Sequence, residues 1–286
     1  MKGIVLAGGT GSRLWPVTKS VSKQLLPVYD KPMIYYPIST LMLAGIREIL
    51  IITTPDDQPD FKNLLGNGSD FGITFNYAVQ PKPEGLAQAL IIGEEFLGGD
   101  SCLMILGDNI FHGAGLGHEL SRSLPNSGAH IFTYEVSNPS DYGVLELDKD
   151  QNPVSITEKP KTFISDLAVT GLYFFDNQAS FAAKAIKPSP RGELEITSLI
   201  EHYLRNQDLT FTQLARGSAW LDTGNPNSLN DAAAYIRIIE ERTGLKIACL
   251  EEVAIQNGWI SRVELRKKLD SYGKNDYAKY LTKITN

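Results

Sequence analysis

The sequence has few cysteines, no excess of positive charge and no long hydrophobic run. Cys102 and Cys249 are the only cysteines and lack the close spacing of a zinc site or redox pair, so we expect free buried thiols in a reducing cytoplasm. Lysine and arginine number 27 against 33 acidic residues, and the net charge of -6 predicts no nucleic-acid partner. The apolar run after Met1 is too short for a signal peptide or membrane span, and no later run is long enough either. We therefore expect no membrane association.

The alternation of apolar runs with amphipathic stretches indicates an α/β protein. With 286 residues and 42% hydrophobic content, the chain can form one large domain or two smaller ones around a substantial core. Short β-branched runs followed by helical periodicity are typical of βαβ units in a mainly parallel sheet. The expected strands cover residues 4–7, 48–53, 73–79, 102–106 and 130–136. The expected helices between them cover residues 33–45 and 86–97, and each ends at or near a glycine.

The middle of the chain is richer in strands, and its end is mostly helical. Expected strands over residues 143–147, 154–158 and 168–175 are separated by polar turns, which indicates a β-rich part inserted over the sheet. From residue 228 the pattern is helical, and residues 245–259 are apolar enough to pack against the rest of the protein. We therefore expect an α/β domain over 1–240, with the inserted part near 142–225, and a helical extension over 241–286 packed on it.

A glycine-rich stretch follows the first expected strand. The letters GGTGSR at residues 8–13 allow backbone amides to turn towards a phosphate at the carboxyl end of that strand. A P-loop would end in Gly-Lys-Ser or Gly-Lys-Thr, and a dinucleotide fingerprint would have a third glycine at Leu14. Neither motif is present. By itself the stretch fits either a phosphate cradle or a tight corner.

The letters that follow the loop carry a more specific signal. The runs RLWP and VSKQLLPVYDKPMIYYP, together with GDNIF, RGELEIT and WLDTG, resemble the sugar-1-phosphate nucleotidylyltransferases, and within them the glucose-1-phosphate thymidylyltransferases. The resemblance covers nearly the whole chain. It implies a Rossmann-like three-layer nucleotidyltransferase fold with a mainly parallel central sheet, an inserted β-rich sugar-binding part and C-terminal helices. It also implies which residues wrap the nucleotide and hold its triphosphate: Gly8, Gly9, Gly11, Arg13 and Lys23.

Two aspartates each follow an apolar run. Asp108 comes after residues 103–106 and Asp222 after residues 219–221, where catalytic groups of α/β sheets gather. Spacing alone cannot pair them, because an isolated aspartate after a strand is commonly a turn residue. The resemblance implies that both bind Mg²⁺, which prefers hard oxygen ligands and retains waters. Asn225 stands where related enzymes have threonine, so the loop after Asp222 departs from their pattern.

The resemblance also implies a base pocket and a sugar site. Gln80 and Gly85 match positions that read a pyrimidine, although without the resemblance their segment would be a loop before a helix. Lys159 is expected to neutralise the sugar phosphate, and Arg191 to add a second cation there, although Arg191 also fits a surface charge. The expected sugar-site residues are Tyr142, Gly143, Glu158 and Val169.

The implied reaction joins dTTP to glucose 1-phosphate, giving dTDP-glucose and pyrophosphate as a first step towards dTDP-sugars such as dTDP-rhamnose. A phosphate monoester is largely dianionic at neutral pH, so an in-line attack on the α-phosphorus requires no general base. Resemblance further implies a homotetramer. The alternatives are a uridylyltransferase making UDP-glucose and a non-catalytic nucleotide sensor, which should have lost a metal carboxylate or phosphate lysine. A nicotinamide oxidoreductase is disfavoured by the missing third glycine.

Overall fold

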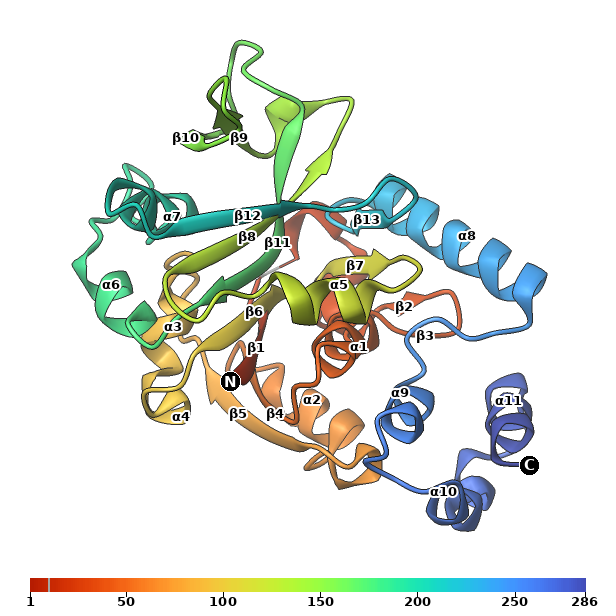
Figure 1. Cartoon of the computed structure of the whole chain (residues 1–286). Helices are drawn as coiled ribbons and strands as arrows, with labels where there is room; N and C mark the ends of the chain where they lie inside the picture. Colours follow the sequence, from red (N-terminus) through yellow and green to blue (C-terminus); the bar gives the residue numbers. More distant parts are fainter. Residues whose placement is uncertain (10) are drawn as a thin grey trace.

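The computed structural model describes residues 1–9 and 11–286, with a nine-stranded sheet at the centre (Figure 1). The strands run in the order β10-β9-β11-β6-β1-β4-β5, and β8 and β12 continue from β11. The strands of this sheet are β1 (Lys2–Ala7), β4 (Glu48–Thr53), β5 (Thr74–Val79), β6 (Cys102–Leu106), β8 (Ala129–Glu135), β9 (Gly143–Leu147), β10 (Pro153–Glu158), β11 (Leu167–Phe175) and β12 (Leu209–Gln213). Two small antiparallel ribbons lie beside it, β2 (Pro27–Val28) with β3 (Lys31–Pro32) and β7 (Asn109–His112) with β13 (Ala219–Asp222).

The first half of the chain builds a parallel core. β1 pairs in parallel with β4 and β6, and β4 pairs in parallel with β5. Strands β1 and β6 are almost entirely buried, as their uninterrupted apolar runs predict. β11 joins β6 in antiparallel orientation, so the sheet becomes mixed beyond the parallel core. The expected α/β architecture around a mainly parallel core is confirmed.

Helices cover both faces of the sheet, because successive strand residues point to opposite sides. Val5 and Ala7 lie in a core shared with α1 (Tyr35–Leu43), α2 (Gln58–Leu65) and α5 (Leu116–Ser123). Ile4 and Leu6 face the opposite core. The helices of that second face are α3 (Gln88–Ile92), α4 (Glu94–Leu97), α6 (Ala179–Ala185) and α7 (Ile196–Arg205). The three layers are visible in Figure 1.

The single helix expected over 86–97 is wrong, because it divides at Gly93 into α3 and α4. Gly93 lies tightly on the sheet: a Cβ there would be 3.1 Å from Ile4 Cδ1 and 3.1 Å from the Ala89 carbonyl oxygen. Helical periodicity continues across the break and so does not reveal it. A side chain at residue 93 would therefore be crowded between the helix and the sheet.

The inserted β-rich part extends the sheet instead of lying over it. β9 pairs with β10, and Val144 of β9 pairs with Ala168 of β11, a strand of the central sheet. This part projects from the body of the protein at the top of Figure 1. α7 packs against β10 and supports its base. The expected strands are present, but the expectation that they lie over the sheet is wrong, because they are part of it.

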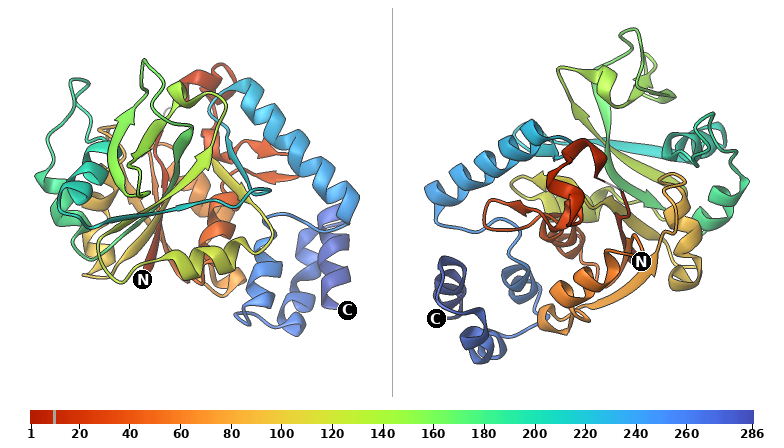
Figure 2. Two further views of the ribbon diagram at one scale, coloured as in Figure 1. Left: turned by 45° about the horizontal axis from the view of Figure 1, so that its top comes forward. Right: turned by 180° about the vertical axis from the view of Figure 1, so that it is seen from behind.

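The C-terminal helices pack on the α/β body. α8 (Pro226–Thr243) begins at Asn225, whose side chain accepts from the backbone of Asn227 and Ser228, so this residue caps the helix. Next come α9 (Leu250–Gln256), α10 (Arg262–Lys268) and α11 (Asp276–Thr285), gathered on one side of the protein (Figure 2). Leu250 and Val253 lie in the core beside α1. The expected boundary at residue 240 falls inside α8.

None of the helices in the described part of the chain combines the length and the apolar character needed to cross a bilayer.

Candidate active site

The glycine-rich loop leaves β1 where the side chains of Gln80 and Thr18 come very close. A Cβ on Gly8 would lie 2.4 Å from Gln80 Oε1, so only glycine allows this side chain to lie against the loop. Gly11 has φ +62, and its carbonyl oxygen accepts a 2.8 Å hydrogen bond from Thr18 Oγ1. Thr10 lies outside the described residues. The described part of the loop is therefore held on both sides in a shape that requires glycine.

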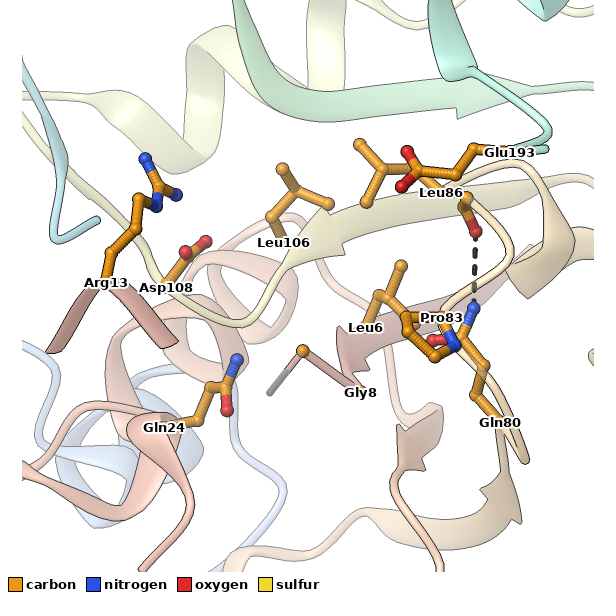
Figure 3. Close-up of a pocket in the computed structure, with 12 residues that line it drawn as sticks. Leu6, Gly8, Arg13, Gln24, Gln80, Pro83, Leu86, Leu106, Asp108 and Glu193 are labelled. Atoms are coloured by element: carbon orange, nitrogen blue, oxygen red, sulfur yellow. Dashed lines mark hydrogen bonds between the residues drawn. The ribbon is translucent and has the colours of Figure 1, made fainter. Parts of the chain in front are cut away.

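A cavity of about 310 Å³ opens beside this loop (Figure 3). In Figure 3 Arg13, Gln24 and Asp108 line one end, whereas Gln80 and Pro83 line the other. Arg13 and Asp108 thus place charges of opposite sign at one end, and an amide and a proline lie at the other. Its remaining lining residues are Leu6, Gly8, Gly9, Gly85, Leu86, Leu106 and Glu193.

Gln80 and Gly85 lie together on the wall of this cavity. Gln80 is buried, and its Nε2 donates to Gln88 Oε1 at 2.7 Å and to the Gly85 carbonyl at 3.3 Å. Gly85 has φ +104, and a Cβ there would be 2.3 Å from the Leu194 carbonyl oxygen. Leu194 also donates to the Glu84 carbonyl at 2.7 Å. The wall is therefore fixed to the segment that leads to α7.

Asp108 lines the end of this cavity where Arg13 lies, and Asp222 lies close enough to Asp108 for their charges to interact. Asp108 follows β6, but Asp222 ends β13, which pairs with β7, so Asp222 lies on a ribbon beside the central sheet and not at the end of one of its strands. Thr223 joins the two segments, since its Oγ1 donates to the Asp108 carbonyl at 2.8 Å. Lys23 Nζ lies 2.5 Å from Asp108 Oδ2. Two residues far apart in sequence thereby form one acidic pair with an adjacent lysine.

The negative charges of Asp108 and Asp222 are only partly neutralised by their neighbours. Burial raises the pKa of Asp222, the charge of Asp108 raises it further, and Lys23 and Arg13 only partly offset these effects. Among the described residues, no three histidine, cysteine, aspartate or glutamate side chains cluster as a metal site. Two carboxylates beside an open cavity suit a hard cation that keeps waters and takes phosphate oxygens as its other ligands. The donor set therefore fits Mg²⁺.

A second cavity, of about 180 Å³, adjoins the first. Both are lined by Arg13, Leu86, Leu106 and Asp108, so they share a wall. Four of the expected sugar-site residues line the second cavity together with Asp222: Tyr142, Gly143, Glu158 and Val169.

A family model described as nucleotidyl transferase matches residues 2–238. The chain belongs to the nucleotidyl transferase family. The chain is also 55% identical to a glucose-1-phosphate thymidylyltransferase of Neisseria meningitidis over 99% of both chains. It is 53% identical to one of Mycolicibacterium smegmatis, again over 99% of both. The expected family and enzyme class are thus confirmed.

Solved structures agree with the fold of this nucleotidyl transferase. A Bacillus anthracis protein described as a candidate glucose-1-phosphate thymidylyltransferase superposes with a TM-score of 0.76 at 42% identity, covering 83% of this chain and 95% of that one. A UDP-glucose pyrophosphorylase, 24% identical, superposes with a TM-score of 0.73 over 83% of this chain and 98% of that one. The latter likeness supports the fold alone.

Three expected cations of the transferase, Lys23, Lys159 and Arg191, lie outside both cavity linings, but Lys23 contacts Asp108. Lys159 is exposed, with φ +46, and its backbone amide donates to the Tyr142 carbonyl at 2.9 Å. Arg191 has a side chain that is 59% exposed and donates to Glu195 Oε1 at 2.8 Å. Glu195 itself lines the second cavity. The structure therefore brings Arg13 and Lys23 to the acidic pair, but does not bring Lys159 or Arg191 there.

Sequence reasoning missed a buried amide that organises the transferase site. Asn109 Nδ2 donates to Asp108 Oδ1 at 2.9 Å, and its Oδ1 accepts from Trp220 Nε1 at 2.6 Å and from the Gly171 amide at 3.2 Å. This single residue links β7, β13 and β11. Its place beside Asp108 in the GDN run was the available signal. Other lining residues that the sequence reasoning did not single out are Gln24, Glu193 and Thr197.

Proposed function

We propose that this nucleotidyl transferase moves a thymidylyl group from dTTP to glucose 1-phosphate, forming dTDP-glucose and pyrophosphate. The observation that carries the proposal is the shared wall: Arg13 and Asp108 line both cavities, so two anionic substrates can meet there. Support for the substrate pair comes from the relatives named glucose-1-phosphate thymidylyltransferase, which align over 99% of this chain.

The larger cavity suits a nucleoside triphosphate. Leu86 and Leu106 offer apolar surface to a base, and Gln80 lies beside them with an amide that can pair with a pyrimidine edge. At the opposite end, Arg13 and Lys23 would hold the phosphates against the glycine-rich loop. The base and the triphosphate would therefore span the cavity from end to end.

The smaller cavity suits the sugar phosphate. Glu158 Oε2 accepts from Thr197 Oγ1 at 3.0 Å, which leaves its other oxygen able to accept from a sugar hydroxyl. Tyr142 and Gly143 border the same space. Glucose 1-phosphate held there would direct its phosphate towards Arg13 and the acidic pair.

The chemistry then depends on alignment and charge. An oxygen of the sugar phosphate, already anionic, attacks the α-phosphorus, and the bond to the pyrophosphate group breaks. No histidine is among the residues that line either cavity in the described chain, which agrees with a nucleophile that needs no general base. Arg13 and Lys23 reduce the repulsion between the two substrates. Mg²⁺ held by Asp108 and Asp222 would supply further positive charge beside the phosphates.

The proposed substrates predict a clear order in a pyrophosphate-release assay. We expect dTTP with glucose 1-phosphate to give the highest kcat/KM, and UTP to be weaker by about 1–3 kcal/mol, the discrimination that one methyl group provides in an apolar pocket. Testing four nucleoside triphosphates against several sugar 1-phosphates measures this directly. Highest kcat/KM with ATP or GTP would contradict the assigned base pocket.

A second prediction separates two cations. Arg13→Ala should lower kcat/KM for dTTP roughly 100-fold, since Arg13 lies beside Asp108 in both cavities. Lys159→Ala should instead raise KM for glucose 1-phosphate roughly 10-fold or more, if this exposed lysine closes on the sugar phosphate. Lys161→Ala, two residues further on and also exposed, is the matched control. Equal effects of Lys159→Ala and Lys161→Ala would remove Lys159 from the site.

We further propose a homotetramer in the cytoplasm that supplies dTDP-glucose to dTDP-sugar synthesis, including dTDP-rhamnose. Both cysteines are free and buried, which suits a reducing compartment. Light scattering on the purified protein tests the tetramer.

A further inference from the structure

Four charged side chains form a closed ring away from both cavities. Lys31 Nζ contacts Asp30 and lies 3.0 Å from Glu240 Oε1, while Lys246 Nζ contacts Asp30 and lies 2.7 Å from Glu240 Oε2. The Lys31 and Glu240 side chains are only 2% and 3% exposed. Each charge thus has two partners of opposite sign, and this charge ring of Asp30, Lys31, Glu240 and Lys246 is neutral overall.

The charge ring joins two segments that come from the active site. Asp30 and Lys31 belong to the turn and second strand of the β2–β3 ribbon, which directly follows Lys23 and Gln24. Residues 24 and 34 are tied together, because the Ile34 amide donates to the Gln24 carbonyl at 2.9 Å. The segment that follows the ribbon is therefore hydrogen-bonded to the segment that carries Lys23.

The other half of the ring comes from the C-terminal part of the chain. Glu240 lies near the end of α8, a helix that begins at Pro226, shortly after Asp222. Lys246 follows that helix, and the Ile247 amide donates to Glu240 Oε1 at 2.9 Å. The family match ends at residue 238, so both residues lie beyond it. Figure 1 shows the β2–β3 ribbon between α8 and the chain that leads to α9.

We propose that the charge ring positions Lys23 for the triphosphate, so that the C-terminal extension takes part in nucleotide binding; this inference rests on the function proposed above. Glu240 and Lys246 are positioning residues, since they act through the β2–β3 ribbon and touch neither cavity wall described for the substrates.

The ring is built so that losing one charge disturbs the whole ribbon. Burial tends to raise the pKa of Asp30, but Lys31 and Lys246 outweigh it and hold that pKa below its ordinary value. Burial tends to lower the pKa of Lys246, and its contacts with Asp30 and Glu240 raise it above the ordinary value. Both groups are therefore charged at neutral pH. Removal of one partner leaves an unmatched buried charge, which forces the surrounding backbone to move.

The test compares Lys246→Met, Glu240→Gln and the double variant in the full-length protein. Each single variant should lower kcat/KM for dTTP roughly 10- to 100-fold, with KM for glucose 1-phosphate within about twofold of normal, because the displaced group serves the triphosphate. The double variant leaves the neutral Asp30–Lys31 pair, so it should recover most of the loss. Hydrogen exchange of residues 23–34 should be faster in the singles and near normal in the double.

Glu241→Gln is the matched control, because Glu241 is the next residue of α8 and forms an exposed ion pair with Arg237. It should leave kinetics and exchange unchanged. If the single variants melt earlier but match Glu241→Gln in kcat/KM for dTTP below their melting temperature, the ring contributes stability alone and the proposal is wrong. If the unmodified protein released no pyrophosphate from dTTP and glucose 1-phosphate, the proposed function would be wrong. Unchanged hydrogen exchange of residues 23–34 in the single variants would separately reject the positioning role.

Discussion

Replacing Asp222 with asparagine should remove most of the pyrophosphate release and leave the protein folded. Asparagine keeps the size of the side chain and one carbonyl oxygen but removes the charge that faces a cation. The rate should fall about 100-fold or more, as when a group that stabilises developing charge is lost. Asp108→Asn should have a similar effect, because Asp108 lines both cavities.

Stability provides an independent readout for this variant. The pKa of Asp222 is raised in the folded protein, so ionising this carboxyl costs more free energy in the folded state than in the unfolded state. The free energy of unfolding therefore decreases as pH rises through the range in which carboxyl groups ionise. At pH 7 the asparagine variant lacks that cost, so its melting temperature should equal or exceed that of the unmodified protein. Loss of activity with a lower melting temperature would indicate a folding defect instead of a lost metal ligand.

The double variant decides whether the two carboxylates act together. If they hold one cation, Asp108→Asn combined with Asp222→Asn should lose little more activity than either single variant, since residues acting as a unit are non-additive. Rates measured over a Mg²⁺ titration provide the comparison. A single variant that stays folded and turns over normally at limiting Mg²⁺ would show that its aspartate is a turn residue.

The second large effect should come from Gly85→Ala. Two costs add at this position: φ is +104, and the new Cβ would lie 2.3 Å from the Leu194 carbonyl oxygen, a backbone atom that cannot simply rotate away. Backbone strain and overpacking together should cost about 2–5 kcal/mol of unfolding free energy. Because Gly85 lines the larger cavity, KM for dTTP should rise as well.

Gly99→Ala separates the two costs. Gly99 has φ +87, but no heavy atom lies within 4 Å of the Cβ position, so only the backbone strain applies. It should cost about 1–2 kcal/mol and leave dTTP use unchanged. Denaturant unfolding with pyrophosphate release on both variants makes the comparison. Equal loss of stability in the two variants would show that the contact between Gly85 and Leu194 is not tight.

Strands were predictable from the sequence where burial is uniform. The run at residues 102–106 coincides with β6, because a central strand covered on both faces has only apolar positions. The break at Gly93 was not predictable, since helical periodicity continues across it and the close approach of Ile4 comes from a distant strand. Local patterns report which face is buried, but they do not report how closely two elements approach.

The site could be predicted only where a motif keeps its residues together. Arg13 and Lys23 lie in one continuous signature, and Asn109 is adjacent to Asp108. The contact between Lys31 and Glu240 joins residues 209 positions apart, and no local pattern contains it. Lys159 shows a further difficulty. Its motif implies that it binds the sugar phosphate, but its side chain is exposed in the structure, so this role must be tested by experiment.

The pairing of β7 with β13 also orders events during synthesis on the ribosome. The parallel core strands β1, β4, β5 and β6 are complete once residue 106 has emerged, so they can associate early. Asp108 must wait for the segment that contains Thr223, 115 positions later, before the acidic pair can form. Contacts of such long sequence separation close late because the loop entropy must first be overcome. A nascent or truncated chain that ends before β13 would therefore carry the glycine-rich loop without the acidic pair, and could not use a captured nucleotide for transfer.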